Sequence, residues 1–157
     1  MSDRSYTLSL AMIVKNEAEN LEKCLSTARP HVDEIVVVDT GSTDGTRAIA
    51  QRYADVFDEI AWPDSFSLAR NHSFDLATGD YIIWLDGDEY IEVPEDWDKI
   101  HEALATPNVT ALRLLLRNVF SGRQLLDSDR AWLIRVVRNH PMIRFSGRVH
   151  NQVAQSL

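Results

Sequence analysis

Two acidic segments, each directly after a run of apolar residues, are the parts of this sequence best suited to chemistry. The run Ile35–Val38 leads into Asp39–Thr46, and the run Tyr81–Leu85 leads into Asp86–Glu89. Such runs, bounded by turn-forming residues, are typical of strands buried on both faces of a parallel sheet. Ligands of these sheets bind beyond the carboxyl ends of the strands. Both acidic segments are therefore expected at a ligand site, where carboxylates favour a bound cation and a phosphate ligand.

The second segment contains an Asp-x-Asp pair, Asp86 and Asp88, separated by Gly87. On an extended chain, side chains two residues apart point to the same side. Two carboxylates on one side suit a hard cation such as Mg²⁺ or Mn²⁺, which would keep coordination positions for phosphate oxygens. An Asp-x-Asp pair is a weak signal by itself, but its position after a buried strand makes it a predicted metal site.

The elements that must position these acids alternate between strand and helix along the first two thirds of the chain. Apolar runs predict the strands, and apolar residues at helical spacing predict the helices. This alternation favours an α/β fold with an open parallel sheet and right-handed crossovers. The predicted strands are 8–14, 34–38, 56–60 and 81–85, and the predicted helices begin at 16 or 17, 46, 65 and 94 and end near 28, 54, 77 and 105.

The pattern changes after Pro107, where no helical period is visible. Residues 109–120 and 131–138 are predicted strands joined by Ser121–Arg123, so a mixed, partly antiparallel sheet is expected there. A length of 157 residues favours a single domain over 1–157. Nothing around 149–153 resembles a natural terminal cap, so truncation of a longer protein with further domains stays open.

The composition narrows the function classes. A net charge of −8 and a pI of about 5.0 argue against non-specific nucleic-acid binding, which needs a basic surface. Cys24 is the only cysteine, so neither an intramolecular disulfide nor a cysteine zinc site is expected. No apolar run approaches about 18 residues and no leader-like N-terminus is visible, which predicts a cytoplasmic protein without a transmembrane segment. Action at the cytoplasmic face of a membrane stays open.

Four motifs occur in an order and spacing that resemble a family 2 glycosyltransferase with the GT-A fold. They are Met12–Glu17, Asp39–Thr46, Ala69–Asn71 and Asp86–Glu89, and the later segment Phe145–His150 resembles the end of that domain. The resemblance implies a Rossmann-like, open, mostly parallel sheet flanked by helices, with an antiparallel or mixed C-terminal part. It also implies a nucleoside-diphospho-sugar donor, a UDP-sugar being favoured, and Mn²⁺ or Mg²⁺ as cofactor. The implied acceptor is a cell-envelope glycan, a lipid-linked saccharide or a protein.

The resemblance implies that four residues hold the donor. Asp39 matches the acid that hydrogen-bonds the nucleobase or ribose, and Asp86 matches the first aspartate of the motif, which handles the ribose. Arg70 and Arg148 are candidates to neutralise the diphosphate or to shape the nucleotide pocket.

The same resemblance implies the metal ligands. Asp88 matches the metal-binding aspartate of the family, Asp86 belongs to the same motif, and His150 occupies the place of a late histidine that ligates metal in GT-A enzymes. The cation would bridge the two phosphates and stabilise the leaving nucleoside diphosphate as a Lewis acid. Gly87 departs from the alanine that many relatives have between the two aspartates.

The catalytic base is not determined by the sequence. Inverting transfer needs a group that deprotonates the acceptor hydroxyl, and a carboxylate is the usual choice. Asp127 and Asp129 are candidates because they lie in the later segment where the acceptor side is expected, and Glu89 is a candidate beside the metal motif. Many relatives have a glutamate directly after the late histidine, and Asn151 stands in its place here.

Aromatic and basic residues outside the motifs have simpler interpretations. The four tryptophans are expected in the core, although Trp62 is also suited to line a sugar pocket. Arginines spread along the later strands are expected to form a solvated face; they are Arg113, Arg117, Arg135, Arg138 and Arg144.

A metal-dependent inverting glycosyltransferase is therefore the leading hypothesis, and two other functions stay open. One is a non-catalytic or truncated module that binds nucleotide and metal, which the short length and Asn151 favour. The other is a phosphatase like the haloacid dehalogenases, which also carry Asp-x-Asp after an apolar strand. Against it, the motif comes in the middle of the chain, after three predicted strands, and Tyr90 replaces the threonine or valine expected two residues after the second aspartate.

Overall fold

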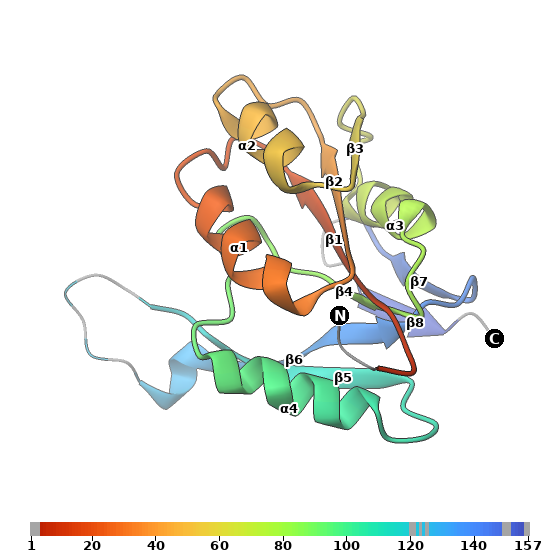
Figure 1. The fold of residues 1–157 in the computed structure, drawn as a ribbon. Coiled ribbons are helices and arrows are strands. Elements are labelled where there is room, and N and C mark those ends of the chain that lie inside the picture. Colours follow the sequence, from red (N-terminus) through yellow and green to blue (C-terminus); the bar gives the residue numbers. More distant parts are fainter. Residues whose placement is uncertain (1–3, 120–121, 123, 125, 149–151, 156–157) are drawn as a thin grey trace.

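A six-stranded mixed sheet forms the centre of the computed structural model, which describes residues 4–119, 122, 124, 126–148 and 152–155 (Figure 1). Its strands are β1 (Leu8–Val14), β2 (Glu34–Asp39), β3 (Val56–Glu59), β4 (Tyr81–Ile83), β5 (Ala111–Arg117) and β6 (Arg130–Arg138). Their order is β3-β2-β1-β4-β6-β5, and the first four run parallel. β6 is antiparallel to β4 and to β5. The predicted α/β class, with an antiparallel C-terminal part, is confirmed.

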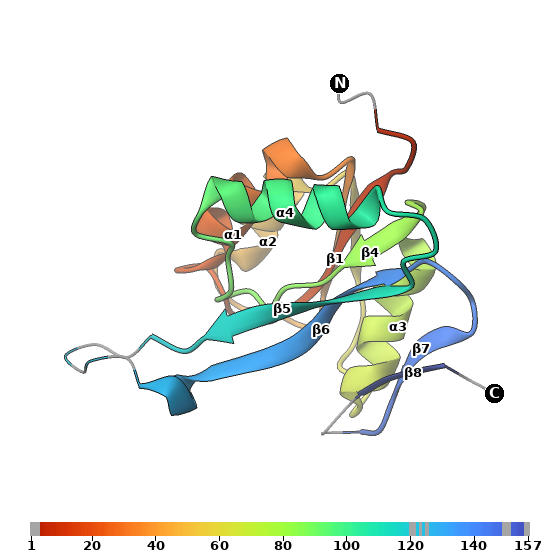
Figure 2. The same ribbon diagram turned by 90° about the horizontal axis from the view of Figure 1, so that it is seen from below.

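Helices cover both faces of this sheet. They are α1 (Leu21–Ala28), α2 (Thr46–Tyr53), α3 (Phe66–Leu76) and α4 (Pro94–Leu104), with short 3-10 helices η1 (Arg29–His31) and η2 (Asp127–Asp129). On one face lie α1, α2 and α4; on the other lie α3 and a separate hairpin of β7 (Ile143–Ser146) and β8 (Gln152–Gln155) (Figures 1 and 2). No helix of the described ranges is long and apolar enough to cross a membrane.

The central strands formed where predicted because both of their faces are buried. On β1, Leu10 and Met12 belong to the core under α1 and α4, and Ala11 between them belongs to the core under α3. Successive side chains of a strand point to opposite faces, so a continuous apolar run fills both cores at once. The strand ends, and with them the acidic segments, are thereby fixed at one edge of the sheet.

The first helix begins later than predicted. Residues 16–20 form turns, and Asn16 has a left-handed backbone with φ of 55°. Asn16 accepts a hydrogen bond from the Thr43 N–H through its side-chain oxygen and donates its own N–H to the Ser42 hydroxyl. A polar side chain that bonds a distant backbone group competes with helix formation. The segment after β1 is therefore tied to the segment after β2 instead of extending α1.

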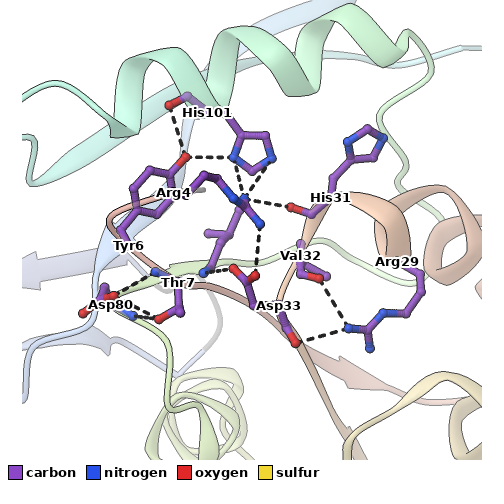
Figure 3. Close-up of polar contacts among 10 residues, drawn as sticks. Arg4, Tyr6, Thr7, Arg29, His31, Val32, Asp33, Asp80 and His101 are labelled. Atoms are coloured by element: carbon purple, nitrogen blue, oxygen red, sulfur yellow. Dashed lines mark hydrogen bonds and ion pairs between the residues drawn. The ribbon is translucent and has the colours of Figure 1, made fainter. Parts of the chain in front are cut away.

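The N-terminal segment fastens α4 to the opposite end of the sheet (Figure 3). The Arg4 guanidinium donates to a ring nitrogen of His101 at 2.8 Å and pairs with Asp33 at 3.0 Å. The Tyr6 hydroxyl donates to the His101 carbonyl at 3.1 Å. His101 lies in the last turn of α4, so these contacts hold that helix against the amino ends of β1 and β2.

We expect Gly79→Ala to destabilise the fold because the added methyl group has no room. An ideal Cβ at this position would lie 2.6 Å from the Ser9 hydroxyl oxygen and 2.9 Å from the Ser9 nitrogen. Overpacking of this kind costs about 1–3 kcal/mol, measurable as a fall in the free energy of unfolding in urea. Gly45→Ala is the control, because its Cβ would only meet Ala18 at 3.7 Å. Equal stability of the two variants would contradict this account.

Candidate functional site

The carboxyl ends of β1, β2 and β4 meet around a cleft of about 390 Å³, named here the small cleft. Its walls come from the ends of these strands, the segment before α3, and α3 itself: Ile13, Val14, Lys15, Glu17, Thr40, Trp62, Phe66, Arg70, Asp86 and Gly87. Residues from both predicted acidic segments therefore line one cavity, as expected from the parallel sheet.

An aromatic pair stands at this cleft. The rings of Trp62 and Phe66 pack edge to face, with centroids 4.9 Å apart, and both side chains remain partly exposed. Trp62 and Trp132 are exposed, whereas Trp84 and Trp97 are in the core, so the expectation of four core tryptophans is wrong for two of them. Trp62 instead lines the small cleft, which matches its alternative interpretation.

Asp39 is a fully buried carboxylate, and one of its two oxygens accepts no hydrogen bond from the described residues. Its exposed fraction is 0%, and its Oδ1 accepts the backbone N–H groups of Gly41 and Ser42 at 2.9 and 2.8 Å. Burial raises the pKa of Asp39, but the hydrogen bonds from Ser42 and Gly41 and the charge of Arg47 outweigh it and lower the pKa below its ordinary value. The buried Oδ2 has no hydrogen-bond partner among the described residues. A buried acceptor in this state is suited to a ligand donor.

The Asp86–Glu89 segment is a turn, because the Glu89 N–H donates to the Asp86 carbonyl at 2.9 Å. The prediction that Asp86 and Asp88 lie on an extended segment is therefore wrong, and the two carboxylates are in different surroundings. The Asp86 Oδ1 lies 2.5 Å from the Arg70 guanidinium, while its Oδ2 lies 3.8 Å from that of Arg135. The Asp88 side chain is exposed, and no bond to it is found within the described ranges.

Gly87 lets the loop after β4 approach the loop after β1. A Cβ at this position would lie 2.6 Å from Cγ and 3.0 Å from Cβ of Glu17. The space that glycine leaves is thus occupied by a protein side chain, so the expectation of free room for a ligand is not met at this atom. Because residue 87 has no side chain, the loop after β4 packs directly against Glu17 of the loop after β1, and both loops line the small cleft.

Arg70 is held at the site by α3. Its residue exposure is 9%, so the alternative of a solvated surface arginine does not apply. The next residue, Asn71, exchanges hydrogen bonds with the backbone of Phe145 at 2.8 and 3.1 Å. These bonds fix α3 to β7, and α3 in turn brings the Arg70 guanidinium to Asp86.

Arg148 lies at the beginning of α3 but not in the small cleft. Its guanidinium pairs with Asp64 at 2.7 Å and remains largely exposed, and its carbonyl accepts the Phe66 N–H at 3.0 Å. Its proposed contact with the donor stays a prediction. His150 and Asn151 lie outside the described residues.

Glu89 and Arg135 form a buried ion pair below the acidic turn. The Glu89 Oε1 lies 2.5 Å from the Arg135 guanidinium, and the side chains are only 14% and 11% exposed. Burial raises the pKa of Glu89, with Asp86 and Asp88 adding to the rise and Arg135 opposing it. The prediction of a solvated arginine at 135 is wrong. The one signal available in the sequence was its place between Ile134 and Val136 in an apolar strand.

A second cavity of about 940 Å³, named here the large cleft, lies between α4 and β5. Asp86, Asp88 and Glu89 stand at the acidic end, and Asp86 also lines the small cleft, so the two cavities meet at this residue. Much of the remaining wall is aliphatic, from Ile91, Ile100, Ala103, Leu112, Leu114, Leu115 and Leu116. A ligand in each cavity would therefore have the turn after β4 between them.

The structure does not bring the other two candidate bases to this turn. Asp129 is buried in η2, where its Oδ2 accepts the Leu126 N–H at 2.8 Å. Asp127 is exposed and pairs with Arg130 at 3.2 Å. Neither residue lines the small or the large cleft. Of the three carboxylates predicted as base, only Glu89 lines one of the two clefts, the large one.

The described residues do not complete a metal site by themselves. Within the described residues, no three His, Cys, Asp or Glu side chains are grouped as a metal site. The exposed Asp88 carboxylate has its oxygens available, whereas Asp86 is already bonded to Arg70. This donor set fits a hard cation bound jointly by Asp88 and by phosphate oxygens, and does not form a closed protein site.

Comparison with known families identifies the chain. The family model described as glycosyl transferase family 2 matches residues 9–140, which include both acidic turns, Arg70 and Arg135. The chain belongs to this family. The resemblance seen in the four motifs is thereby confirmed, and the fold around the sheet is that of a family 2 glycosyltransferase domain.

The matching relatives are longer than this chain. A TPR repeat-containing protein of Synechococcus elongatus is 39% identical over 150 residues, which are 96% of this chain and 36% of that protein. The prophage-derived glycosyltransferase SunS of Bacillus subtilis is 28% identical over 153 residues, or 93% of this chain and 34% of SunS. The chain thus spans about a third of the length of these relatives.

A solved structure shares the fold. The glucosyl-3-phosphoglycerate synthase of Mycobacterium tuberculosis, in complex with Mn²⁺, UDP and glucosyl-3-phosphoglycerate, superposes with a TM-score of 0.57 at 20% identity. The match covers 69% of this chain and 43% of the synthase. At this identity the likeness shows the fold alone.

We expect the stability advantage of wild type over Asp39→Asn to depend on pH. The lowered pKa means that the ionised carboxylate stabilises the folded state. The advantage, about 1.5–3 kcal/mol for hydrogen bonds to a charged group, should be complete above the unfolded pKa of about 4. It should shrink as the pH falls through the lower folded pKa. Urea unfolding of both proteins between about pH 7 and pH 3 measures it, and a difference that stays constant would contradict the assignment.

Proposed function

We propose that this chain is the catalytic domain of a metal-dependent, inverting glycosyltransferase that takes its sugar from a nucleoside-diphospho-sugar, with a UDP-sugar favoured. The observation that carries the proposal is the edge of the sheet around the small cleft. A buried carboxylate with an unbonded oxygen, Asp39, directly precedes the cleft-lining Thr40, and the buried Arg70 lines the cleft. The exposed Asp88 directly follows the cleft-lining Gly87 and lines the neighbouring large cleft. Membership of family 2 supports the proposal.

In this proposal the nucleoside is held next to β2. Asp39 Oδ2 would accept a hydrogen bond from the nucleobase or the ribose, which satisfies the buried oxygen. The aromatic pair of Trp62 and Phe66 provides an apolar wall for the base or the sugar. Asp86, which lines the small cleft, would contact the ribose or the diphosphate.

The diphosphate would bind where positive charge is already fixed. Arg70 supplies a buried guanidinium, which binds phosphate oxygens with two parallel hydrogen bonds when geometry allows. Asp88 and Asp86, with His150 as a predicted third ligand, would hold Mn²⁺ or Mg²⁺. When bound, that cation would stabilise the negative charge of the leaving nucleoside diphosphate. The Mn²⁺ and UDP bound to the Mycobacterium synthase support this choice of cofactor and nucleotide.

The large cleft is the proposed acceptor side. It includes Asp88 and runs along β5 and α4, where aliphatic side chains alternate with charged ones such as Lys99 and Arg113, so an acceptor with both an apolar and a polar part fits it. A glycan, a lipid-linked saccharide and a protein remain the proposed acceptor classes. Cytoplasmic location, with or without action at the membrane face, is proposed on the sequence alone. Glu89, Asp127 and Asp129 stay the predicted bases, and Glu89 is the one that lines this cleft.

The phosphatase alternative has no support from the family match. The non-catalytic module is a second outcome of the following experiment, because it would bind nucleotide without releasing sugar. Binding is measured first, and turnover of the donor is measured on the same protein.

We expect UDP with Mn²⁺ to raise the melting temperature, and GDP, CMP and ADP to raise it less. A ligand at a hundredfold excess over its Kd stabilises the folded state by about 2.7 kcal/mol, or about 5–10 °C for a domain of this size. The shift should vanish with EDTA and in Asp88→Ala, and persist in Glu102→Ala, which removes one exposed acid outside both clefts.

No shift with any nucleotide would refute the proposed donor site. A shift without Mn²⁺ dependence would refute the metal. A Mn²⁺-dependent shift without release of UDP from UDP-sugars, in the presence of acceptors from all three classes, would favour the non-catalytic module.

A further inference from the structure

Arg135 is a buried charge that the proposed function does not use. It is 9% exposed, it lines neither cleft, and it lies on the antiparallel extension of the sheet, outside the motifs that carry the family resemblance. We propose that Arg135, acting through Glu89, is the positioning residue that holds the Asp86–Glu89 turn in the shape that binds the diphosphate and its metal. This inference rests on the proposed function.

A bulge in β6 turns Arg135 toward the acidic turn. Leu112 of β5 pairs with Val136, and the next residue, Arg113, pairs with Ile134, so Arg135 is the extra residue between the two pairs. A bulge redirects the side chain of the extra residue and increases the local twist of the strand. The Arg135 carbonyl accepts the Trp84 N–H at 3.1 Å, which ties the bulge to the end of β4.

Two contacts connect the guanidinium to the turn, and two further bonds close the turn itself. Arg135 Nη2 lies 2.5 Å from Glu89 Oε1 and 3.8 Å from Asp86 Oδ2. The other Glu89 oxygen, Oε2, accepts the backbone N–H of Asp86 at 2.9 Å. The Glu89 N–H donates back to the Asp86 carbonyl at 2.9 Å. Glu89 thus closes a ring with Asp86, and Arg135 fixes the side chain that closes it.

The charges of the turn require this arginine. Asp86, Asp88 and Glu89 place three carboxylates within four residues, and Glu89 is buried. Arg70 compensates Asp86 from the side of α3, and Arg135 is the cation that contacts Glu89. Without Arg135, a buried carboxylate would face Asp86 without a counter-charge, which is strongly unfavourable. The turn would then open toward solvent, and the Asp88 carboxylate would lose its fixed place.

Because Arg135 itself lines neither cleft and contacts the cleft-lining residues Asp86 and Glu89, its effect on binding must pass through the turn. Outer residues that orient a metal ligand typically cost about 10–100-fold in metal affinity or activity when they are replaced. The same range is expected here for the Kd of UDP in the presence of Mn²⁺. Arg138, three residues further along β6, bonds Tyr81 at the other end of β4 and serves as a matched control.

The test is a titration calorimetry cycle with UDP and Mn²⁺ on wild type, Arg135→Met, Glu89→Gln, the double variant and Arg138→Met. We expect each single variant at the ion pair to raise the Kd by about 10–100-fold. The Kd of the double variant should be close to that of the single variant that binds UDP less tightly, because both changes remove the same coupled ion pair. Arg138→Met should bind like wild type. Arg135→Lys, which keeps a charge with different geometry, should recover part of the affinity.

Calorimetry separates this role from a purely structural one. A residue needed only for folding would lower the binding stoichiometry and leave the Kd of the folded fraction unchanged. Unchanged Kd in Arg135→Met or, if that variant does not fold, in Arg135→Lys would overturn the inference, as would additive losses in the double variant. If the wild-type protein binds no nucleotide, the result refutes the proposed function itself, and with it the role of Arg135 that rests on it.

Discussion

Compensation of buried negative charge at the carboxyl edge of the sheet is the constraint on which the rest of the structure depends. Asp39 is fully buried and is stabilised by two backbone N–H groups and the charge of Arg47. Asp86 lies between the guanidinium groups of Arg70 and Arg135. A fully buried carboxylate such as Asp39 could not be kept ionised without partners, because desolvation without a partner costs several kcal/mol. The positions of these partners therefore determine which elements must be fixed.

Those partners come from elements on different sides of the sheet. Arg70 is carried by α3, which lies beside the β7–β8 hairpin (Figure 2). The Asn71–Phe145 bonds and the hydrogen bond from the Ser67 hydroxyl to the Gly147 carbonyl fasten this helix to the hairpin segment. Arg135 is carried by β6, beyond the parallel core. The antiparallel extension is thus more than a cover for the sheet edge. It supplies one of the two cations that make the acidic turn possible, and it forms one wall of the large cleft.

The sequence predicted what depends on continuous burial. β1 has the predicted bounds, and β2 and β3 differ from theirs by one residue, because strands buried on both faces leave uninterrupted apolar runs. The order of the motifs predicted the fold and the meeting of Asp39 with Asp86 at one edge. Local geometry was predicted less well from the sequence. The start of α1 was misplaced because Asn16 bonds a distant backbone group, and the Asp86–Glu89 segment proved to be a turn.

Arg135 shows why the remainder could not be predicted. The two-residue alternation of a regular strand predicts the face to which each side chain points. A single extra residue in β6 changes that prediction for Arg135. The pairing that creates the bulge joins residues distant in sequence, so it is not encoded in any short motif. The acceptor is equally inaccessible, because an aliphatic cleft wall describes a kind of surface rather than one molecule.

The most direct test of the central claim is a crystal structure with UDP and Mn²⁺, with the metal located by its anomalous scattering. The account predicts a Mn²⁺ peak bound by Asp88 and the diphosphate, the uridine beside Asp39 in the small cleft, and the Arg135–Glu89 pair intact beneath the turn. A metal bound away from Asp88, or a nucleotide seated in the large cleft, would contradict it.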